Sequence, residues 1–114
     1  MHPRSPKLLE DIRDAAAFIK ASTLGSEAET FRQDRLLRQA VERNFEIIGE
    51  AIRRIDKEDP ETAGRIANHR NIIAFRNVLS HGYDIIDPAI VWSAIRDDLD
   101  PLLKAVEALL ATVG

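Results

Sequence analysis

The sequence contains no cysteine and no long apolar segment. The lack of cysteine excludes a disulfide framework, a thiolate metal site and a cysteine nucleophile, and it fits a reducing cytoplasm. No apolar run approaches the roughly 20 residues that a membrane-spanning helix needs. The first residues, Met1 to Pro6, carry charge but no apolar run follows them, as it would in a signal peptide. We therefore expect a soluble cytoplasmic protein that does not associate with membranes.

An excess of positive charge is also missing, since the formal net charge is −3. Proteins that bind nucleic acid over a broad surface are usually basic, so this balance argues against such binding but leaves room for a local basic cleft. Of the 16 basic residues, 12 are arginine. Arginine suits bidentate phosphate contacts, and it is also a good helix former. Its abundance is therefore explained either by phosphate binding or by the helical composition of the chain.

The apolar residues recur with a period near 3.6, which is typical of amphipathic helices. The length of 114 residues predicts one domain that spans residues 1–114. Turn-forming residues divide the pattern at Gly25, Asp59-Pro60, Gly82 and Asp87-Pro88. Four amphipathic helices joined by short connections bury their apolar stripes most simply as a bundle. We therefore predict an all-α, four-helix up-down bundle.

Two helices are expected in the N-terminal half. The first spans Ser5 to Ser22, with Ser5 as its cap, and the residues from Thr23 to Glu29 form a loop. The second spans Thr30 to Lys57, where apolar residues at alternating spacings of four and three form a heptad-like seam. Gly49 lies in the middle of this helix, where glycine costs about 1 kcal/mol relative to alanine. A close approach of another helix would explain this glycine, and so would chance.

Two more helices are expected in the C-terminal half. The third begins at Asp59-Pro60, with the aspartate as N-cap and the proline at the first helical position, and it ends between Ser80 and Gly82. Gly64 and Asn68 weaken its first turns, so an alternative start lies nearer Asn68. The fourth begins at the similar pair Asp87-Pro88. Pro101 lies inside its apolar pattern and should kink or break it, because proline removes one intrahelical hydrogen bond.

The segment from Arg76 to Tyr83 gathers residues that could carry chemistry. It contains a fixed cation at Arg76, a carboxamide at Asn77, an imidazole at His81 and a phenol at Tyr83. Cleavage of RNA without a metal needs a group that transfers protons and a cation that stabilises charge on the phosphoryl oxygens. Histidine can transfer protons near neutral pH, and arginine supplies the charge.

The spacing of the arginine and the histidine sets a geometric condition. In a continuous helix, Arg76 and His81 point about 140° apart. If the helix stops near Ser80 and Gly82 takes a left-handed conformation, His81 can turn back towards Arg76. The alternative is that His81 only complements the helix dipole and has no catalytic role.

These residues resemble the R-x4-H-x-Y motif of the HepT toxins, which belong to the HEPN superfamily. The segment Gln39–Ala51 is similar to the family's helix-two signature, Asn71–Asn77 resembles its run into the motif, and Ile90–Leu102 resembles its last helix. The resemblance covers Lys7 to Leu103. One departure is His69, where the family commonly has a tryptophan; it affects no catalytic position.

The resemblance implies the toxin half of a toxin–antitoxin pair, a metal-independent endoribonuclease with Arg76 and His81 as catalytic residues and Asn77 in a supporting role. The expected partner is a minimal nucleotidyltransferase (MNT) antitoxin, which silences such toxins by transferring AMP to the motif tyrosine, here Tyr83. We expect no cofactor. We expect no metal either, because the histidines do not have a metal-ligand spacing.

A homodimer is also expected, because HEPN nucleases generally build their cleft from two motifs that face each other across a two-fold axis. Since the net charge is negative, RNA must be attracted by a local basic patch. Candidates besides the motif arginine are Arg70 and, from the second helix, Arg43 and Arg53. Glu46 and Glu50 lie one turn apart on that helix, and we interpret them as solvated helix charges.

Two other functions stay open from the sequence. The chain could be a non-catalytic helical subunit that binds nucleotide or substrate for a minimal nucleotidyltransferase, in which case Arg76 and His81 would hold a phosphate and cleave nothing. It could also be a purely structural dimer of helices. Cleavage of RNA in EDTA that is lost in His81→Ala would separate the enzyme from the binding module.

Overall fold

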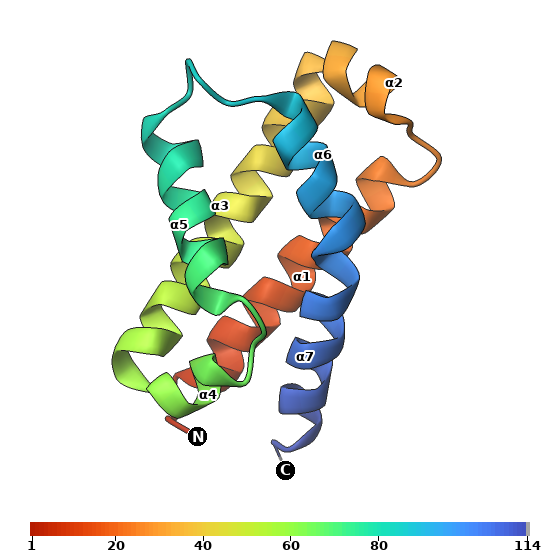
Figure 1. Cartoon of the computed structure of the whole chain (residues 1–114). Coiled ribbons are helices and arrows are strands. Elements are labelled where there is room, and N and C mark those ends of the chain that lie inside the picture. The colour runs from red at the N-terminus through yellow and green to blue at the C-terminus, as the bar shows by residue number, and fades with distance from the viewer. Residues whose placement is uncertain (114) are drawn as a thin grey trace.

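The computed structural model describes residues 1–113. Within these residues it contains helices and no strand (Figure 1). The helices are α1 (Ser5–Thr23), α2 (Ala28–Gln33), α3 (Arg35–Glu58), α4 (Pro60–Gly64), α5 (His69–His81), α6 (Pro88–Asp97) and α7 (Leu99–Ala111). The four long rods, α1, α3, α5 and the α6–α7 pair, run alternately up and down (Figure 1). The predicted all-α bundle is confirmed.

Helix α3 is the centre of the bundle, because α1 packs along one side of it and α5 along another. Its buried apolar residues alternate at spacings of four and three, as the seam predicted: Val41, Phe45, Ile48, Ile52 and Ile55. Helix α7 covers α1, and α5 contacts the rest of the bundle mainly through α3. The position of α5 therefore depends on its contacts with one neighbour.

The prediction that one helix runs from Thr30 to Lys57 is wrong at its start. Helix α2 ends at Gln33, and α3 begins after Asp34, whose side chain accepts a hydrogen bond from the Leu37 N–H at 3.0 Å. Asp34 thus acts as an N-cap in the middle of the predicted helix. The separate short helix places Phe31 in the core, with its ring centroid 5.4 Å from that of Trp92.

Asp59 caps α4 as predicted, accepting hydrogen bonds from the Thr62 N–H at 3.3 Å and the Thr62 hydroxyl at 2.7 Å. The expected third helix is divided, because α4 ends at Gly64 and α5 begins after Asn68, which has a left-handed φ of 61°. Ser5 is not the cap of α1. It is buried as the first helical residue, and its hydroxyl donates to Asp59 at 3.0 Å, joining the start of α1 to the start of α4.

The fourth predicted helix begins and breaks where the sequence indicates. Asp87 caps α6 by accepting from the Ala89 N–H at 2.9 Å. The chain leaves the helix at Asp98, between α6 and α7. Pro101 lies one turn later, where it cannot donate to the carbonyl of Asp97 and its ring would clash with that carbonyl. The predicted break is confirmed. In the part of the chain that the structure describes, no helix has the length and apolarity to cross a membrane.

Candidate active site

Helix α5 lies against α3 at Gly49. A Cβ atom built at this glycine would lie 2.2 Å from Cβ of Arg76 and 3.2 Å from the carbonyl oxygen of Ile72. The first distance is shorter than real Cβ contacts and the second is tighter than most of them, so a side chain does not fit here unless Arg76 moves. Of the two explanations that the sequence leaves for Gly49, close helix approach is therefore confirmed.

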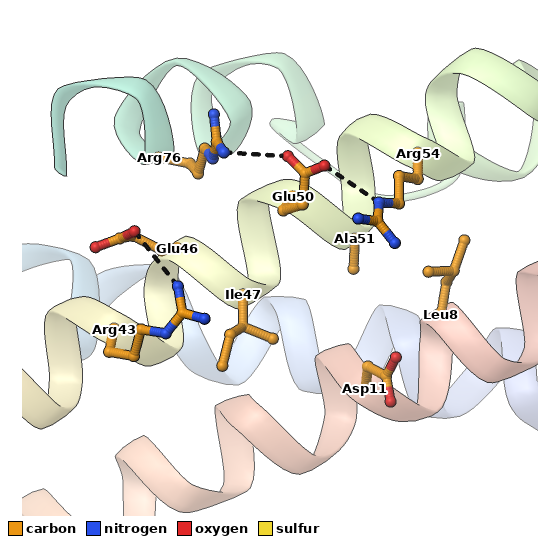
Figure 2. A pocket seen from close by; sticks show the side chains of 9 residues that line it. All are labelled: Leu8, Asp11, Arg43, Glu46, Ile47, Glu50, Ala51, Arg54 and Arg76. Atoms are coloured by element: carbon orange, nitrogen blue, oxygen red, sulfur yellow. Dashed lines mark hydrogen bonds and ion pairs between the residues drawn. The ribbon is translucent and has the colours of Figure 1, made fainter. Parts of the chain in front are cut away.

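The close approach brings Arg76 to a carboxylate on α3. Nη2 of Arg76 lies 3.3 Å from Oε2 of Glu50, and both side chains are about one-quarter exposed, at 26% and 25% (Figure 2). Glu50 also accepts hydrogen bonds from Arg53, at 2.9 and 3.1 Å, and from Arg54 at 3.1 Å. The hydrogen bonds from Arg53 and Arg54, with the charges of Arg53 and Arg76, lower the pKa of Glu50 to about 2. Our interpretation of Glu50 as a solvated charge is wrong.

The remaining donors of Arg76 have unequal surroundings. Nη1 donates to Oδ1 of the exposed neighbour Asn77 at 3.1 Å. Nε is buried and has no hydrogen-bond partner among the described residues. Contacts on two sides thus hold the guanidinium between Glu50 and Asn77.

Glu46 lies one turn before Glu50 on the same face of α3, and it contacts the end of α5. Its Oε2 atom accepts a hydrogen bond from the Ser80 hydroxyl at 3.2 Å. The same oxygen lies 3.6 Å from Nη1 of Arg43 (Figure 2). Glu46 is half-buried and, like Glu50, it is an interhelical contact as well as a helix charge.

A cavity of about 190 Å³ lies between α1, α3 and α5. Its walls carry three arginines and three carboxylates together with apolar residues (Figure 2): Leu8, Asp11, Arg43, Glu46, Ile47, Glu50, Ala51, Arg54 and Arg76. The three arginines of the wall equal its three carboxylates in number, and ion pairs join Arg43 to Glu46 and both Arg54 and Arg76 to Glu50. The wall is therefore not basic as a whole, and what it offers a phosphate is the hydrogen-bond donors of its guanidinium groups.

The predicted RNA-binding arginines fall into three positions. Arg43 lines the cavity, Arg53 binds Glu50 without lining it, and Arg70 lies exposed on the first turn of α5, away from the lining residues. Arg54 also lines the cavity, although it is not among the arginines that the sequence predicts to bind RNA. Its spacing of four residues from Glu50 is the signal that could have found it, because such pairs meet on one helix face.

The expectation that His81 turns back towards Arg76 is wrong. Helix α5 continues through His81, and Gly82 has a φ of −115°, so it is not left-handed. The Gly82 N–H donates to the Val78 carbonyl at 2.7 Å, which carries the helical bonding pattern past the histidine. Arg76 and His81 therefore point about 140° apart. His81 is exposed and does not line the arginine cavity.

Tyr83 follows α5 and is 85% exposed. His69, which stands where a tryptophan is common, is half-buried with Nε2 at 3.6 Å from Asp56, so it joins the start of α5 to the end of α3. Within residues 1–113, no group of three or more His, Cys, Asp or Glu is placed to hold a metal ion.

A second cavity, of about 330 Å³, lies between α3, α5 and the α6–α7 junction. Apolar side chains, among them Phe45, Ile72, Phe75 and Leu102, form much of its wall, and none of its lining residues is basic. The arginine-lined cavity is therefore the better candidate for a site that contacts phosphate.

Comparison with known proteins identifies the family of this chain. A family model described as ribonuclease HepT-like matches residues 12–109. The chain belongs to the HepT-like ribonuclease family. The matched range covers most of the chain, so the family inferred from the sequence is confirmed.

Individual relatives of this HepT-like chain cover nearly all of its length. A candidate RNase of Methanocaldococcus jannaschii is 31% identical over 99 residues, which is 87% of this chain and 90% of the relative. A candidate RNase of Caldanaerobacter subterraneus is 31% identical over 102 residues, 90% of each chain. A Thermococcus cleftensis protein named "Probable ribonuclease HepT" is 32% identical over 101 residues, 89% of this chain and 91% of the relative. No solved structure matches the chain significantly.

Proposed function

We propose that this HepT-like protein is a metal-independent endoribonuclease that acts in the cytoplasm as the toxin of a toxin–antitoxin pair. The observation that carries the proposal is the placement of Arg76. The motif arginine is held between Glu50 and Asn77 at the edge of a cavity that other arginines line. The names of three relatives, which describe RNases, support RNA as the substrate.

The proposed reaction is transesterification at a phosphodiester. The 2′-oxygen of RNA attacks the adjacent phosphorus, the bond to the 5′-oxygen breaks, and a 2′,3′-cyclic phosphate forms. One proton leaves the 2′-hydroxyl and another reaches the 5′-oxygen, and His81 would carry out proton transfer. Arg76 would stabilise the negative charge on the non-bridging oxygens. Asn77 would keep the guanidinium in place through the bond between Nη1 and Oδ1.

We also propose that the working form is a homodimer with Arg76 and His81 of both copies lining a shared groove. The divergence of the two side chains around α5 supports this, because one copy does not present both to a single phosphate by its own backbone geometry. Two copies supply a second arginine and a second histidine. Light scattering at micromolar concentration should give the mass of a dimer, and a monomer would count against the shared site.

The proposed antitoxin is a minimal nucleotidyltransferase that modifies Tyr83. The side chain is 85% exposed, so its hydroxyl is open to an enzyme. In the modification a base of the nucleotidyltransferase takes the phenolic proton and the tyrosine oxygen attacks the α-phosphate of ATP. The new O–P bond forms as the bond between the α- and β-phosphates breaks, and pyrophosphate leaves. The attached group would place negative charge two residues from His81 and obstruct the approach of RNA.

The test is cleavage of RNA by the purified protein in EDTA. Wild type should cleave, and His81→Ala should not, although both should unfold at nearly the same temperature because an exposed substitution usually changes stability by no more than about 0.5 kcal/mol. His2→Ala, outside the motif, is the matched control and should cleave. RNA that is bound but not cleaved by wild type would favour a non-catalytic binding subunit. Cleavage that survives in His81→Ala would contradict the assigned role.

A further inference from the structure

The contact between α3 and α5 contains two polar side-chain pairs, one turn apart, which we call rungs. Glu50 pairs with Arg76 and Glu46 accepts a hydrogen bond from Ser80. Within each helix the two members are four residues apart, so each pair lies on one helix face. The helices run in opposite directions, and the earlier residue of α3 therefore meets the later residue of α5. Gly49 lies beside the rungs and allows the close approach.

Two contacts one turn apart restrict the movement of α5 against α3 more than a single contact would. A single rung would let α5 rotate about its axis, whereas two rungs on one face hold both its rotation and its position along α3. Apolar contacts also hold α5 in place. Leu79 is buried, Ile72, Ile73 and Phe75 pack against the core, and the ring centroid of Phe75 lies 5.4 Å from that of Phe45 on α3. Of these apolar contacts only Leu79 lies in the last turn of α5, so the Glu46–Ser80 contact adds the polar restraint nearest to His81.

We propose that Glu46 is a positioning residue for the cleavage reaction: it holds Ser80, and through Ser80 it sets the direction of the His81 side chain. The proposal rests on the proposed ribonuclease function. Ser80 directly precedes His81, so a rotation of the last turn of α5 moves the imidazole with it. Because Ser80 is fixed on the α3 side, His81 is directed about 100° around the helix, into solvent.

Glu46 and Glu50 contact different residues of α5. Both oxygens of Glu50 are engaged by arginines, and its contact with α5 fixes Arg76. Glu46 uses one oxygen, Oε2, for both Ser80 and Arg43. The first rung thus holds the cation of the motif, and the second rung holds its proton-transfer group.

The test compares variants that remove or keep the hydrogen bond. Glu46→Ala and Ser80→Ala lose it, whereas Glu46→Gln keeps an acceptor and Ser80→Thr keeps a hydroxyl. In RNA cleavage, each alanine variant should lower kcat about tenfold with little change in KM, because misplacing a catalytic group affects the chemical step. The double alanine variant should be no slower than either single one. Both conservative variants should approach wild type, as should Glu107→Ala, a change on the exposed face of α7.

A second measurement does not depend on cleavage. The NMR signal of the His81 ring in the protein without RNA should move in Glu46→Ala and in Ser80→Ala, and the Gly82 amide, which bonds to Val78, should exchange faster. If wild type cleaves no RNA, the ribonuclease proposal fails. The NMR measurement still tests whether Glu46 and Ser80 set the direction of the His81 side chain. An unmoved His81 signal, an unchanged kcat in Glu46→Ala, or additive losses in the double variant would each overturn the positioning role.

Discussion

Gly49 of α3 and Arg76 of α5 face each other so closely that a methyl group on the glycine would lie 2.2 Å from Cβ of the arginine. The backbone that carries the motif arginine is therefore held against the central helix without an intervening side chain. This contact places the guanidinium within 3.3 Å of Glu50. The position of the proposed catalytic cation is thus built into the packing of the bundle.

Gly49→Ala should destabilise the protein, although alanine is normally the better helix former by about 1 kcal/mol. The added Cβ meets Arg76 Cβ, which belongs to the stiff base of that side chain, so overpacking should cost about 1–3 kcal/mol. Gly64→Ala is the matched control, because nothing lies within 4 Å of a Cβ built there, and it should leave stability equal or higher. Urea unfolding measures both. A Gly49→Ala protein as stable as wild type would contradict the close packing.

Glu50 should make stability depend on acid pH. Its pKa is lowered from 4.5 to about 2 in the folded state, so it stabilises the fold above about pH 4.5 and loses that contribution as the pH falls towards 2. Glu50→Gln should therefore be less stable than wild type at neutral pH, and the difference should shrink over this window.

Unfolding free energies measured for both proteins between pH 2 and 7 give that difference. Asp59, whose pKa hydrogen bonds from Thr62 and His2 also lower, is present in both proteins, so its effect cancels. Glu107→Gln controls for loss of an exposed carboxylate. A constant difference between wild type and Glu50→Gln would show that the arginine contacts do not stabilise the charged form.

The sequence predicted those helix boundaries that depend on local chemistry. Asp59-Pro60 and Asp87-Pro88 begin helices because aspartate caps and proline fits the first turn, and Pro101 breaks a helix because it lacks a donor. The break at Asp34 was missed. Aspartate is a common N-cap, but inside a run of helix-forming residues it does not by itself mark a break; in the structure Asp34 caps α3, and Phe31 before it is buried in the core.

The candidate site was predictable in its residues and less so in its geometry. The motif gave Arg76 and His81, but the direction of His81 depends on Gly82, which either ends a helix in a left-handed turn or, as here, follows it with a negative φ. The carboxylates of Glu46 and Glu50 meet residues about 30 positions later in the chain. Such pairs depend on how two helices are rotated against each other, which apolar periodicity alone does not specify.

Cleavage should weaken as salt rises, since RNA would be attracted by the arginines of the cavity wall and not by the chain as a whole. A plot of log kcat/KM against log salt should slope downwards, and Arg54→Ala should reduce the slope by about 0.7 because it removes one phosphate contact to single-stranded RNA. Arg96→Ala, on α6 and outside the cavity, should leave the slope unchanged. A rate that does not respond to salt would contradict phosphate contacts by these arginines.

Tyr83→Phe should keep the toxicity of the protein but remove its inactivation by the antitoxin. The exposed phenol lies outside the core, so the variant should fold and keep some cleavage activity, but it offers no oxygen for AMP transfer. Expressed with the nucleotidyltransferase, wild type should be neutralised and Tyr83→Phe should still arrest growth. Mass spectrometry should find AMP on wild type alone. Full neutralisation of Tyr83→Phe without any transferred AMP would mean that the antitoxin acts by occlusion.

Arg76 and His81 are proposed to act together although they point to different sides of α5. The most direct test mixes two inactive variants, Arg76→Ala and His81→Ala, after unfolding and refolding them together, and measures RNA cleavage in EDTA. A site shared between copies predicts that the mixture recovers activity which neither variant has alone, because a mixed dimer contains one intact arginine and one intact histidine. A mixture that forms mixed dimers and stays as inactive as its components would contradict the shared site.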